Sequence, residues 1–239
     1  AGPKALEHLV DVVLYLEGDK THTFRLLRSV KNRYGSTNEV GVFEMKDRGL
    51  QEVPNPSQML LAERPVDAPG SVVMATVEGT RPFLVEIQAL VTPSVLALPR
   101  RTTIGFDGGR ASLLMAVLEK QLHLNFAQYD LFINVAGGIR LGEPAADLPV
   151  SLAIISSSLD RPLPSNLVAW GEVGLTGEVR GVGYGILRLT EAVRLGFNKI
   201  LLPASTADQI RHEPIAQGVE FIGVRNLKEV MRKVFPPGR

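Results

Sequence analysis

Two closely spaced prolines, Pro54 and Pro56, constrain the fold of this chain most, because proline breaks both helices and sheets. They mark residues 53–57 as a linker. The chain before this linker is rich in residues that favour strands, whereas the chain after it mixes helical and strand patterns without strict alternation. We therefore predict two units, residues 1–55 and residues 56–239.

The first unit is predicted to contain only strands. Residues 9–17 are mostly apolar, as in a buried strand, and Gly18 and Asp19 predict a turn after them. Further strands are predicted at residues 22–30, 39–45 and 50–53. A small cluster of strands is only marginally stable by itself, so we expect this unit to lean on the second one.

The second unit is predicted to be α+β. Helical spacing and capping residues predict helices at residues 57–63 (with Ser57 as the N-cap), 109–124, 147–157 and 186–195, and from residue 226. Strands are predicted at residues 71–78, 82–91, 129–136, 167–175, 178–182 and 199–202. Trp170 is expected in the core.

Composition excludes several classes of function. The net charge is +1 over 239 residues, so any binding of nucleic acid must come from a local patch. The chain has no cysteine, and its four histidines lack ligand spacing, which argues against disulfides and metal sites. No apolar run reaches the ~18 residues of a membrane span and no signal peptide opens the chain, so we expect a cytoplasmic protein without membrane contact. The start at Ala1, without methionine, suggests a piece of a longer protein.

A compact basic motif follows the predicted strand at residues 22–30. It consists of Lys31, Asn32, Arg33, Tyr34 and Gly35. In an extended chain the residues i and i+2 point to the same side, so the two cations form one positive prong that suits an anion such as a phosphate. The alternative is a solvated strand end without a function.

The run around this motif, residues 29–45, closely resembles the segment of the RadA/Sms family of bacterial recombination proteins that carries the KNRFG motif, with Tyr34 in place of phenylalanine. Residues 1–19 resemble the end of that family's RecA-like ATPase domain, and the chain after about residue 56 resembles its Lon-protease-like domain. The resemblance therefore implies an α+β fold, in which a Lon-protease-like domain is preceded by the C-terminal strands of a RecA-like α/β ATPase domain.

The resemblance also implies what the parent protein does. Members of this family look like DNA-dependent ATPases that act as branch-migration helicases in homologous recombination and DNA repair. Such a parent would form a homohexameric ring, bind single-stranded and branched DNA, and work with a recombinase. ATP, magnesium and a zinc finger are implied for the parent, and this chain carries none of those sites. Lys31 and Arg33 would act across a subunit boundary, near a neighbour's nucleotide or the DNA.

The sequence offers no ATP site of its own. The phosphate-binding pattern G-x-x-x-x-G-K-S/T is absent, and residues 18–21 imitate only its tail. We therefore expect this chain to have no ATPase activity alone.

The Lon-like half also lacks the Ser–Lys pair that Lon proteases use. Aligned on the shared Asp147 and Pro149, Val150 takes the place of the nucleophile. Counted from the shared Gly177, Glu178 and Val179, Ile186 takes the place of the lysine. On a helix, the side chain of Ser151 would project about 100° away from that of Val150. An arginine such as Arg188 is a poor general base. We expect no proteolysis, and an active serine peptidase is the disfavoured alternative.

Arginine is the preferred cation of this chain, with 18 arginines against 8 lysines. Arginine suits forked recognition of phosphate or carboxylate. The candidates for DNA contact are Arg100, Arg101, Arg110, Arg140 and Arg180, with Arg188 and Arg194 as further members of the basic set. The alternative is ion pairing with Glu143, Asp147 and Glu172 or between subunits. If that alternative holds, the chain would be an oligomerisation module with no DNA contact.

Overall fold

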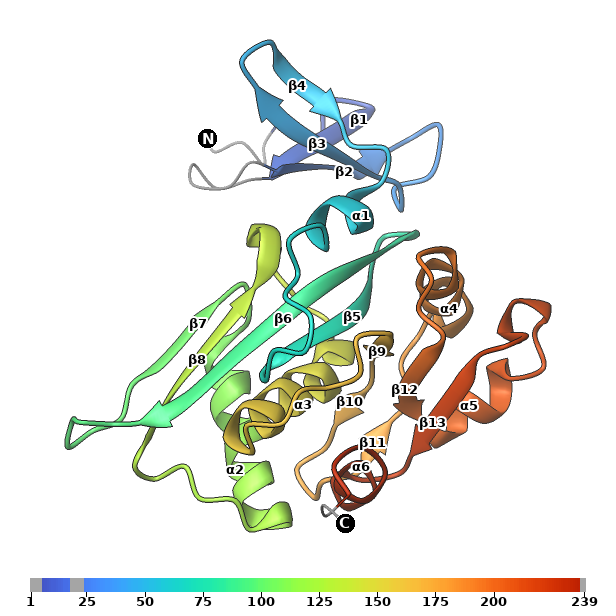
Figure 1. Ribbon diagram of the computed structural model, residues 1–239. Coiled ribbons are helices and arrows are strands. Elements are labelled where there is room, and N and C mark those ends of the chain that lie inside the picture. Colours follow the sequence, from blue (N-terminus) through green and yellow to red (C-terminus); the bar gives the residue numbers. More distant parts are fainter. Residues whose placement is uncertain (1–5, 18–23, 237–239) are drawn as a thin grey trace.

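The computed structural model describes residues 6–17 and 24–236, which form two β-sheets joined by a short segment (Figure 1). The first sheet is antiparallel and has the strand order β1-β2-β3-β4. Its strands are β1 (Val12–Glu17), β2 (Phe24–Asn32), β3 (Val40–Lys46) and β4 (Gly49–Glu52).

The second sheet has seven strands in the order β13-β12-β9-β5-β6-β8-β7. Its strands are β5 (Ser71–Glu78), β6 (Arg81–Pro93), β7 (Arg101–Ile104), β8 (Tyr129–Val135), β9 (Leu167–Ala169), β12 (Lys199–Pro203) and β13 (Glu220–Val224). Pairing is antiparallel on both sides of β6 and parallel everywhere else, so β6 runs against the other six. A separate two-stranded ribbon joins β10 (Glu172–Val173) to β11 (Val179–Arg180).

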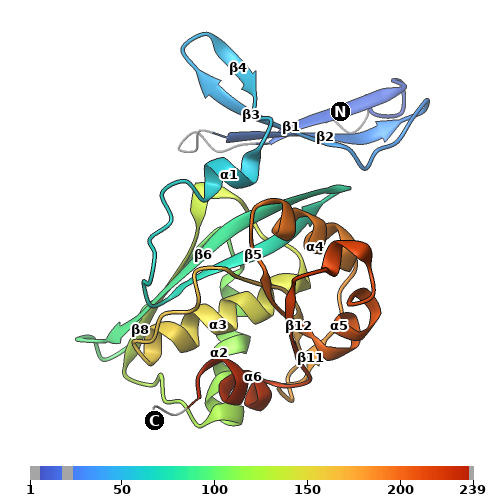
Figure 2. The ribbon, with the colours of Figure 1, turned by 45° about the vertical axis from the view of Figure 1, so that its right-hand side comes forward.

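In the described part of the chain six helices accompany the strands: α1 (Pro56–Leu60), α2 (Gly108–Leu122), α3 (Asp147–Ser158), α4 (Gly185–Arg194), α5 (Ala204–Ile210) and α6 (Leu227–Val234). Short 3-10 turns lie at η2 (Ala136–Gly138), η3 (Pro144–Ala146) and η4 (Pro214–Ala216). Helices α2, α3 and α6 gather below the large sheet, and α1 lies between the two sheets (Figures 1 and 2). The architecture is therefore mixed α/β, and its assignment to a Lon-like or RecA-like fold stays a prediction.

The core belongs to the second unit. The middle of β5, from Val73 to Ala75, is wholly buried, and so are Leu84 of β6 and Trp170. Helix α3 is buried around most of its circumference, because it lies between the sheet and α2. Apolar residues that fill both faces of a strand are typical of a sheet covered on both sides. No helix in the described part of the chain is long and apolar enough to cross a membrane.

The turn between β5 and β6 holds the first sheet in place. Thr80 donates its backbone N–H to the carbonyl of Asn38 at 2.8 Å. A Cβ on Gly79 would lie 1.9 Å from that same carbonyl oxygen, so only glycine fits there. Arg81 donates to three carbonyls of the first unit and the linker, those of Val40, Val53 and Pro54, each at 3.3 Å. The first sheet thus contacts the second unit through polar backbone groups. We had expected the first unit to be supported by the second.

Several predicted boundaries were wrong. Asn55, not Ser57, caps α1, because its side chain accepts the backbone N–H of Gln58 while Pro56 takes the first helical position. The strand predicted at residues 167–175 is two strands, broken at Gly171, which has a φ of 155°.

The pattern also missed β7, which begins at Arg101, as well as β13 and α5. The strand predicted at residues 9–17 begins only at Val12. The turn predicted at Gly18 and Asp19, and residues 18–21 as a whole, lie outside the described residues.

Candidate functional site

The basic motif forms a compact turn at the end of β2. Asn32 braces it, because its side-chain oxygen accepts the N–H of Tyr34 at 3.1 Å and its amide nitrogen donates to the carbonyl of Ser36 at 3.3 Å. A Cβ on Gly35 would lie 2.9 Å from the Asn32 amide nitrogen, so this packing needs glycine or a shift of that side chain. The sequence Asn-x-x-Gly thus sets the shape of the turn that carries the cations.

The two cations of the motif do not form a free prong. The Lys31 ammonium donates to the carbonyl of Glu7 at 2.7 Å, and the Arg33 guanidinium pairs with Asp11 at 3.2 Å. The Arg33 backbone N–H also donates to the Asp11 carbonyl at 3.0 Å. The Arg33 side chain remains 74% exposed and Tyr34 is 79% exposed. An ion pair this exposed is weak, so Arg33 can exchange Asp11 for another anion.

The candidate arginines at the start of β7 hold β7 to β8. Arg100 grips the buried carboxylate of Asp130 through its backbone N–H at 2.7 Å and its guanidinium at 2.9 and 3.1 Å. The backbone N–H of Arg100 is the main reason that the pKa of Asp130 lies below its ordinary value. Arg101 donates to the carbonyls of Tyr129 and Phe126. Both arginines therefore have structural partners within the chain.

Arg110 and Arg180 are also paired. Arg110, in the first turn of α2, makes a two-pronged contact with Asp147, which is fully buried and also accepts the backbone N–H of Val173 at 3.0 Å. The hydrogen bond to Asp147 raises the pKa of Arg110. Arg180 pairs with Glu178 on the surface. The intramolecular pairing that the sequence left open is thus present for these arginines, and their contact with DNA stays a prediction.

The two positions that a Lon-type pair would use lie in different environments. Val150 is fully buried in α3, whereas Ile186 is 48% exposed at the start of α4. The hydroxyl of the buried Ser151 has no hydrogen-bond partner among the described residues.

An ion pair instead joins the two chain segments concerned. Arg188 is 1% exposed and pairs with Glu143, and its Nε donates to the Gly183 carbonyl at 3.1 Å. Glu143 also accepts the hydroxyl of Thr76 at 2.6 Å and the N–H of Val77 at 3.2 Å. The alternative of intramolecular pairing with Glu143 therefore applies to Arg188. These contacts lock α4 to the end of β5.

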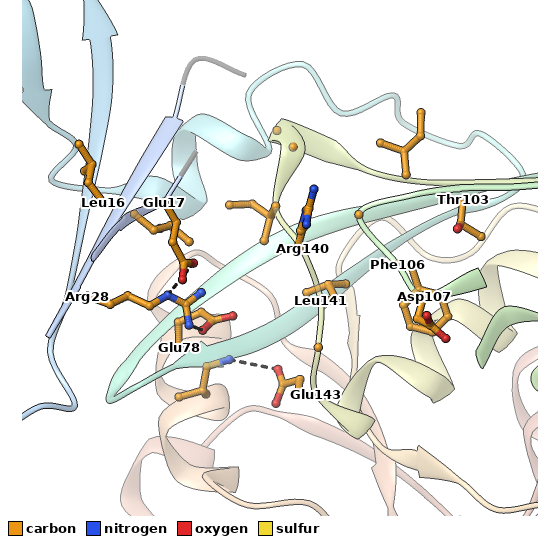
Figure 3. A pocket seen from close by; sticks show the side chains of 18 residues that line it. Leu16, Glu17, Arg28, Glu78, Thr103, Phe106, Asp107, Arg140, Leu141 and Glu143 are labelled. Carbon is orange, nitrogen blue, oxygen red and sulfur yellow. Dashed lines mark hydrogen bonds and ion pairs between the residues drawn. The ribbon is translucent and has the colours of Figure 1, made fainter. Parts of the chain in front are cut away.

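A cavity of about 1400 Å³ lies between the first sheet and the carboxyl ends of β5, β7 and β8 (Figure 3). Its walls combine apolar side chains with charged ones; the charged residues are Glu17, Arg28, Glu78, Asp107, Arg140 and Glu143. Of the sequence candidates, only Arg140 lines this cavity. The sequence named Glu143 only as an ion-pair partner and did not mark the other four, because they come from both units and meet only in the fold.

Arg28 is shared by two carboxylates on the first-sheet side of the cavity. It pairs with Glu17 at 3.1 Å and with Glu78 at 2.7 Å. Burial raises the pKa of Glu78 above its ordinary value, and Arg28 opposes that shift. Within residues 6–17 and 24–236 no group of three or more acidic or histidine side chains is placed to hold a metal ion.

Comparison with known proteins finds close relatives over nearly the whole chain. A protein named DNA repair protein RadA from Streptococcus pneumoniae is 51% identical over 235 residues, which is 98% of this chain and 55% of that protein. The protein of the same name from Bacillus subtilis is 51% identical over 232 residues, 97% of this chain and 50% of the relative. That from Brucella abortus is 51% identical over 208 residues, 87% of this chain and 44% of the relative.

A family model described as subunit ChlI of Mg-chelatase matches residues 110–206, from the start of α2 into α5. This match covers less than half of the chain and leaves out the first sheet. The chain spans about half the length of the curated relatives it matches.

Proposed function

Since this chain belongs to the family of proteins named DNA repair protein RadA, we propose that it is the assembly and DNA-contact part of a DNA repair protein. The 51% identity over 98% of the chain is the observation that carries this proposal. The parent is a cytoplasmic DNA-dependent ATPase and branch-migration helicase that works with a recombinase. ATP and magnesium bind outside this chain, which has no phosphate-binding pattern of its own.

The basic motif acts on a neighbouring subunit or on DNA. Arg33 and Tyr34 are exposed while Asn32 and Lys31 hold the turn, and this arrangement supports contact with another molecule. Arg33 would exchange its weak pair with Asp11 for a phosphate, to which a guanidinium can make two parallel hydrogen bonds. The motif would in this way link ATP hydrolysis in one subunit to its neighbour, as an arginine finger does.

The second unit acts as a Lon-like scaffold for a homohexameric ring and has no peptidase activity. The pair of Arg188 and Glu143 supports this, because it fixes with structural contacts the region where a Lon-type enzyme carries its reacting groups. Two alternatives remain: an oligomerisation module without DNA contact, and a serine peptidase. Labelling of Ser151 by a serine-reactive probe would contradict the scaffold proposal.

The motif is tested in the full-length parent with Arg33→Ala. We expect ATP-dependent branch migration to fall at least about tenfold, since a charged hydrogen bond contributes roughly 1.5–3 kcal/mol. The melting temperature should not change, because the lost pair is exposed. Arg48→Ala is the matched control, since Arg48 is an exposed arginine in the turn at the opposite end of the same sheet. Normal branch migration by Arg33→Ala would remove the proposed role.

DNA contact by the second unit is tested by salt dependence. Replacing Arg100 alone would leave Asp130 buried without a partner, so Arg100→Gln is combined with Asp130→Asn. If Arg100 contacts a phosphate, affinity for single-stranded DNA should fall and the slope against the logarithm of salt concentration should drop by about one. An unchanged slope for this variant and for Arg180→Ala would favour the scaffold without DNA contact.

A further inference from the structure

The cavity between the two units has an open strand edge as one of its walls. β7 pairs only with β8 among the described residues, so its other side has no partner strand. Thr103 and Ile104, at the carboxyl end of β7, line the cavity, and Ile104 is 51% exposed. An unpaired edge presents backbone N–H and C=O groups that can bind an extended chain.

The side chains around this edge are largely apolar and come from both units. Leu16, from the first sheet, lines the opposite wall and is 51% exposed. Phe106 and Leu141 form the floor next to β7. Gly142, at the same wall, has open space where a Cβ would stand, so a ligand can approach its backbone closely.

The carboxylates of the cavity are already engaged. Arg28 holds Glu17 and Glu78. Arg188 holds Glu143, and Asp107 caps α2 by accepting the backbone N–H of Arg110 at 2.7 Å.

Arg140 differs from these groups. The structure gives it no hydrogen bond or ion pair among the described residues, and in the view of Figure 3 it stands between Glu78 on one side and Asp107 on the other. The cavity therefore combines apolar side chains with one cation that lacks a partner among the described residues.

We propose that this cavity binds an extended, mainly apolar peptide segment of a partner protein, which pairs with the open edge of β7 and places one carboxylate on Arg140. This binding site lies beyond the proposed assembly and DNA-contact function. The peptide's backbone would satisfy the edge of β7, its apolar side chains would contact Leu16 and Ile104, and its acidic residue would supply the partner that Arg140 lacks.

A peptide fits the charges of this cavity better than DNA does. The lining holds four carboxylates, those of Glu17, Glu78, Asp107 and Glu143, against the two guanidinium groups of Arg28 and Arg140. A strand of DNA carries one charge per phosphate and would bring several anions against these carboxylates. A peptide with a single carboxylate brings only one anion, which Arg140 can pair with. Arg140 is also a candidate for DNA contact, and the two occupants predict opposite results.

The probe is a fluorescein-labelled peptide in which valine and threonine alternate around one central glutamate. A second peptide has lysine in place of the glutamate, and a third has N-methyl groups along one edge of its backbone. Binding to the full chain is measured by fluorescence polarisation. We expect the chain to prefer the glutamate peptide over the lysine peptide at least about tenfold, as a charge-assisted hydrogen bond would give. The N-methylated peptide should bind much more weakly, because it cannot pair with β7.

The charge swap Arg140→Glu should reverse the preference, so that the lysine peptide binds more tightly than the glutamate peptide. Arg48→Glu, outside the cavity, should leave the preference unchanged, and the unfolding transition of each variant shows that the fold is intact. Equal binding of the glutamate and lysine peptides, or no binding at millimolar concentration, would overturn the proposal. Loss of oligothymidylate binding in Arg140→Glu without any peptide preference would assign Arg140 to DNA instead.

Discussion

The two sheets contain similar apolar strands, but the larger sheet buries far more of their side chains than the first sheet does. Val73 and Met74 of β5 are fully buried, whereas Leu14 and Leu16 of β1 are 55% and 51% exposed. The larger sheet has helices packed against it and forms a continuous core, while the first sheet is attached mainly by the polar contacts of the β5–β6 turn. The comparison teaches that strand-forming sequence alone does not make a core, because a strand also needs a surface to cover it.

The largest expected effect comes from breaking the buried polar group of the second unit. In Asp147→Ala, Arg110 and the backbone N–H of Val173 both lose their acceptor. Loss of one partner of a buried ion pair costs about 3–5 kcal/mol of unfolding free energy, to be measured in urea. Asp208→Ala, which removes an exposed pair with Arg211, should cost less than about 0.5 kcal/mol. A loss below about 1 kcal/mol for Asp147→Ala would mean that the pair is not structural.

The second prediction tests the comparison directly with the same substitution in both sheets. Leu84→Ala opens a cavity in the core of the larger sheet and should cost about 2–5 kcal/mol. Leu14→Ala, on β1, should cost less than about 1 kcal/mol, since its side chain is more than half exposed. Thermal or urea unfolding of the two variants measures the difference. Equal losses would show that β1 is covered as fully as β6 in solution.

The third prediction concerns a substitution that weakens the contact between the two sheets and leaves the core residues unchanged. Arg81→Ala removes hydrogen bonds to the carbonyls of Val40, Val53 and Pro54, and leaving such groups unpaired costs roughly 1–3 kcal/mol. Amide hydrogen exchange should rise in β2 and β3 and stay unchanged in β12 and β13. Arg225→Ala, at an exposed arginine far from the joint, should change neither region. A uniform rise over both sheets would mean that they unfold as one unit.

The smallest expected effect concerns the titration of the Glu178 carboxyl group on the surface of the second unit. The hydroxyl of Thr176, then a backbone N–H and then Arg180 stabilise the ionised Glu178 and lower its pKa from 4.5 to about 2. Its contribution to stability is therefore present above pH 4.5 and is lost as the pH falls toward 2. An NMR titration of the Glu178 carboxyl should show this midpoint, and Thr176→Val should raise it. A midpoint near 4.5 in the unsubstituted chain would contradict the assignment.

Local signals in the sequence predicted the longer elements of the second unit best. The strand predicted at residues 71–78 was confirmed with the same bounds. The helix predicted at residues 147–157 was confirmed at its start, because Asp147 and Pro149 mark its first turn clearly, and it ends one residue later than predicted. Short elements with half-buried patterns were missed, as with the seven residues of α5, which follow Pro203 without a capping side chain.

The contacts of the candidate site were harder to predict from the sequence, since they join residues that lie far apart along the chain. Arg110 and Asp147 are 37 residues apart, and Arg100 and Asp130 are 30 apart, so spacing could not decide between internal pairing and DNA contact. Ser57 shows the same limit, because its hydroxyl bonds to Glu191, which lies 134 residues away. Local chemistry predicts caps and turns, whereas tertiary partners follow from the completed fold.

The long strand β6 has a mechanical consequence. Its 13 residues carry Arg81, at the joint with the first sheet, and end at Pro93, just before the protruding loop that exposes Val95 and Leu98. At ~3.3 Å per residue the strand is a stiff beam of roughly 43 Å. A tilt of about 5° at the Arg81 end would swing the far tip by about 4 Å over that length. A tilt that the smaller sheet imposes on β6 at Arg81 would therefore displace the loop that follows Pro93 at the other end of the strand.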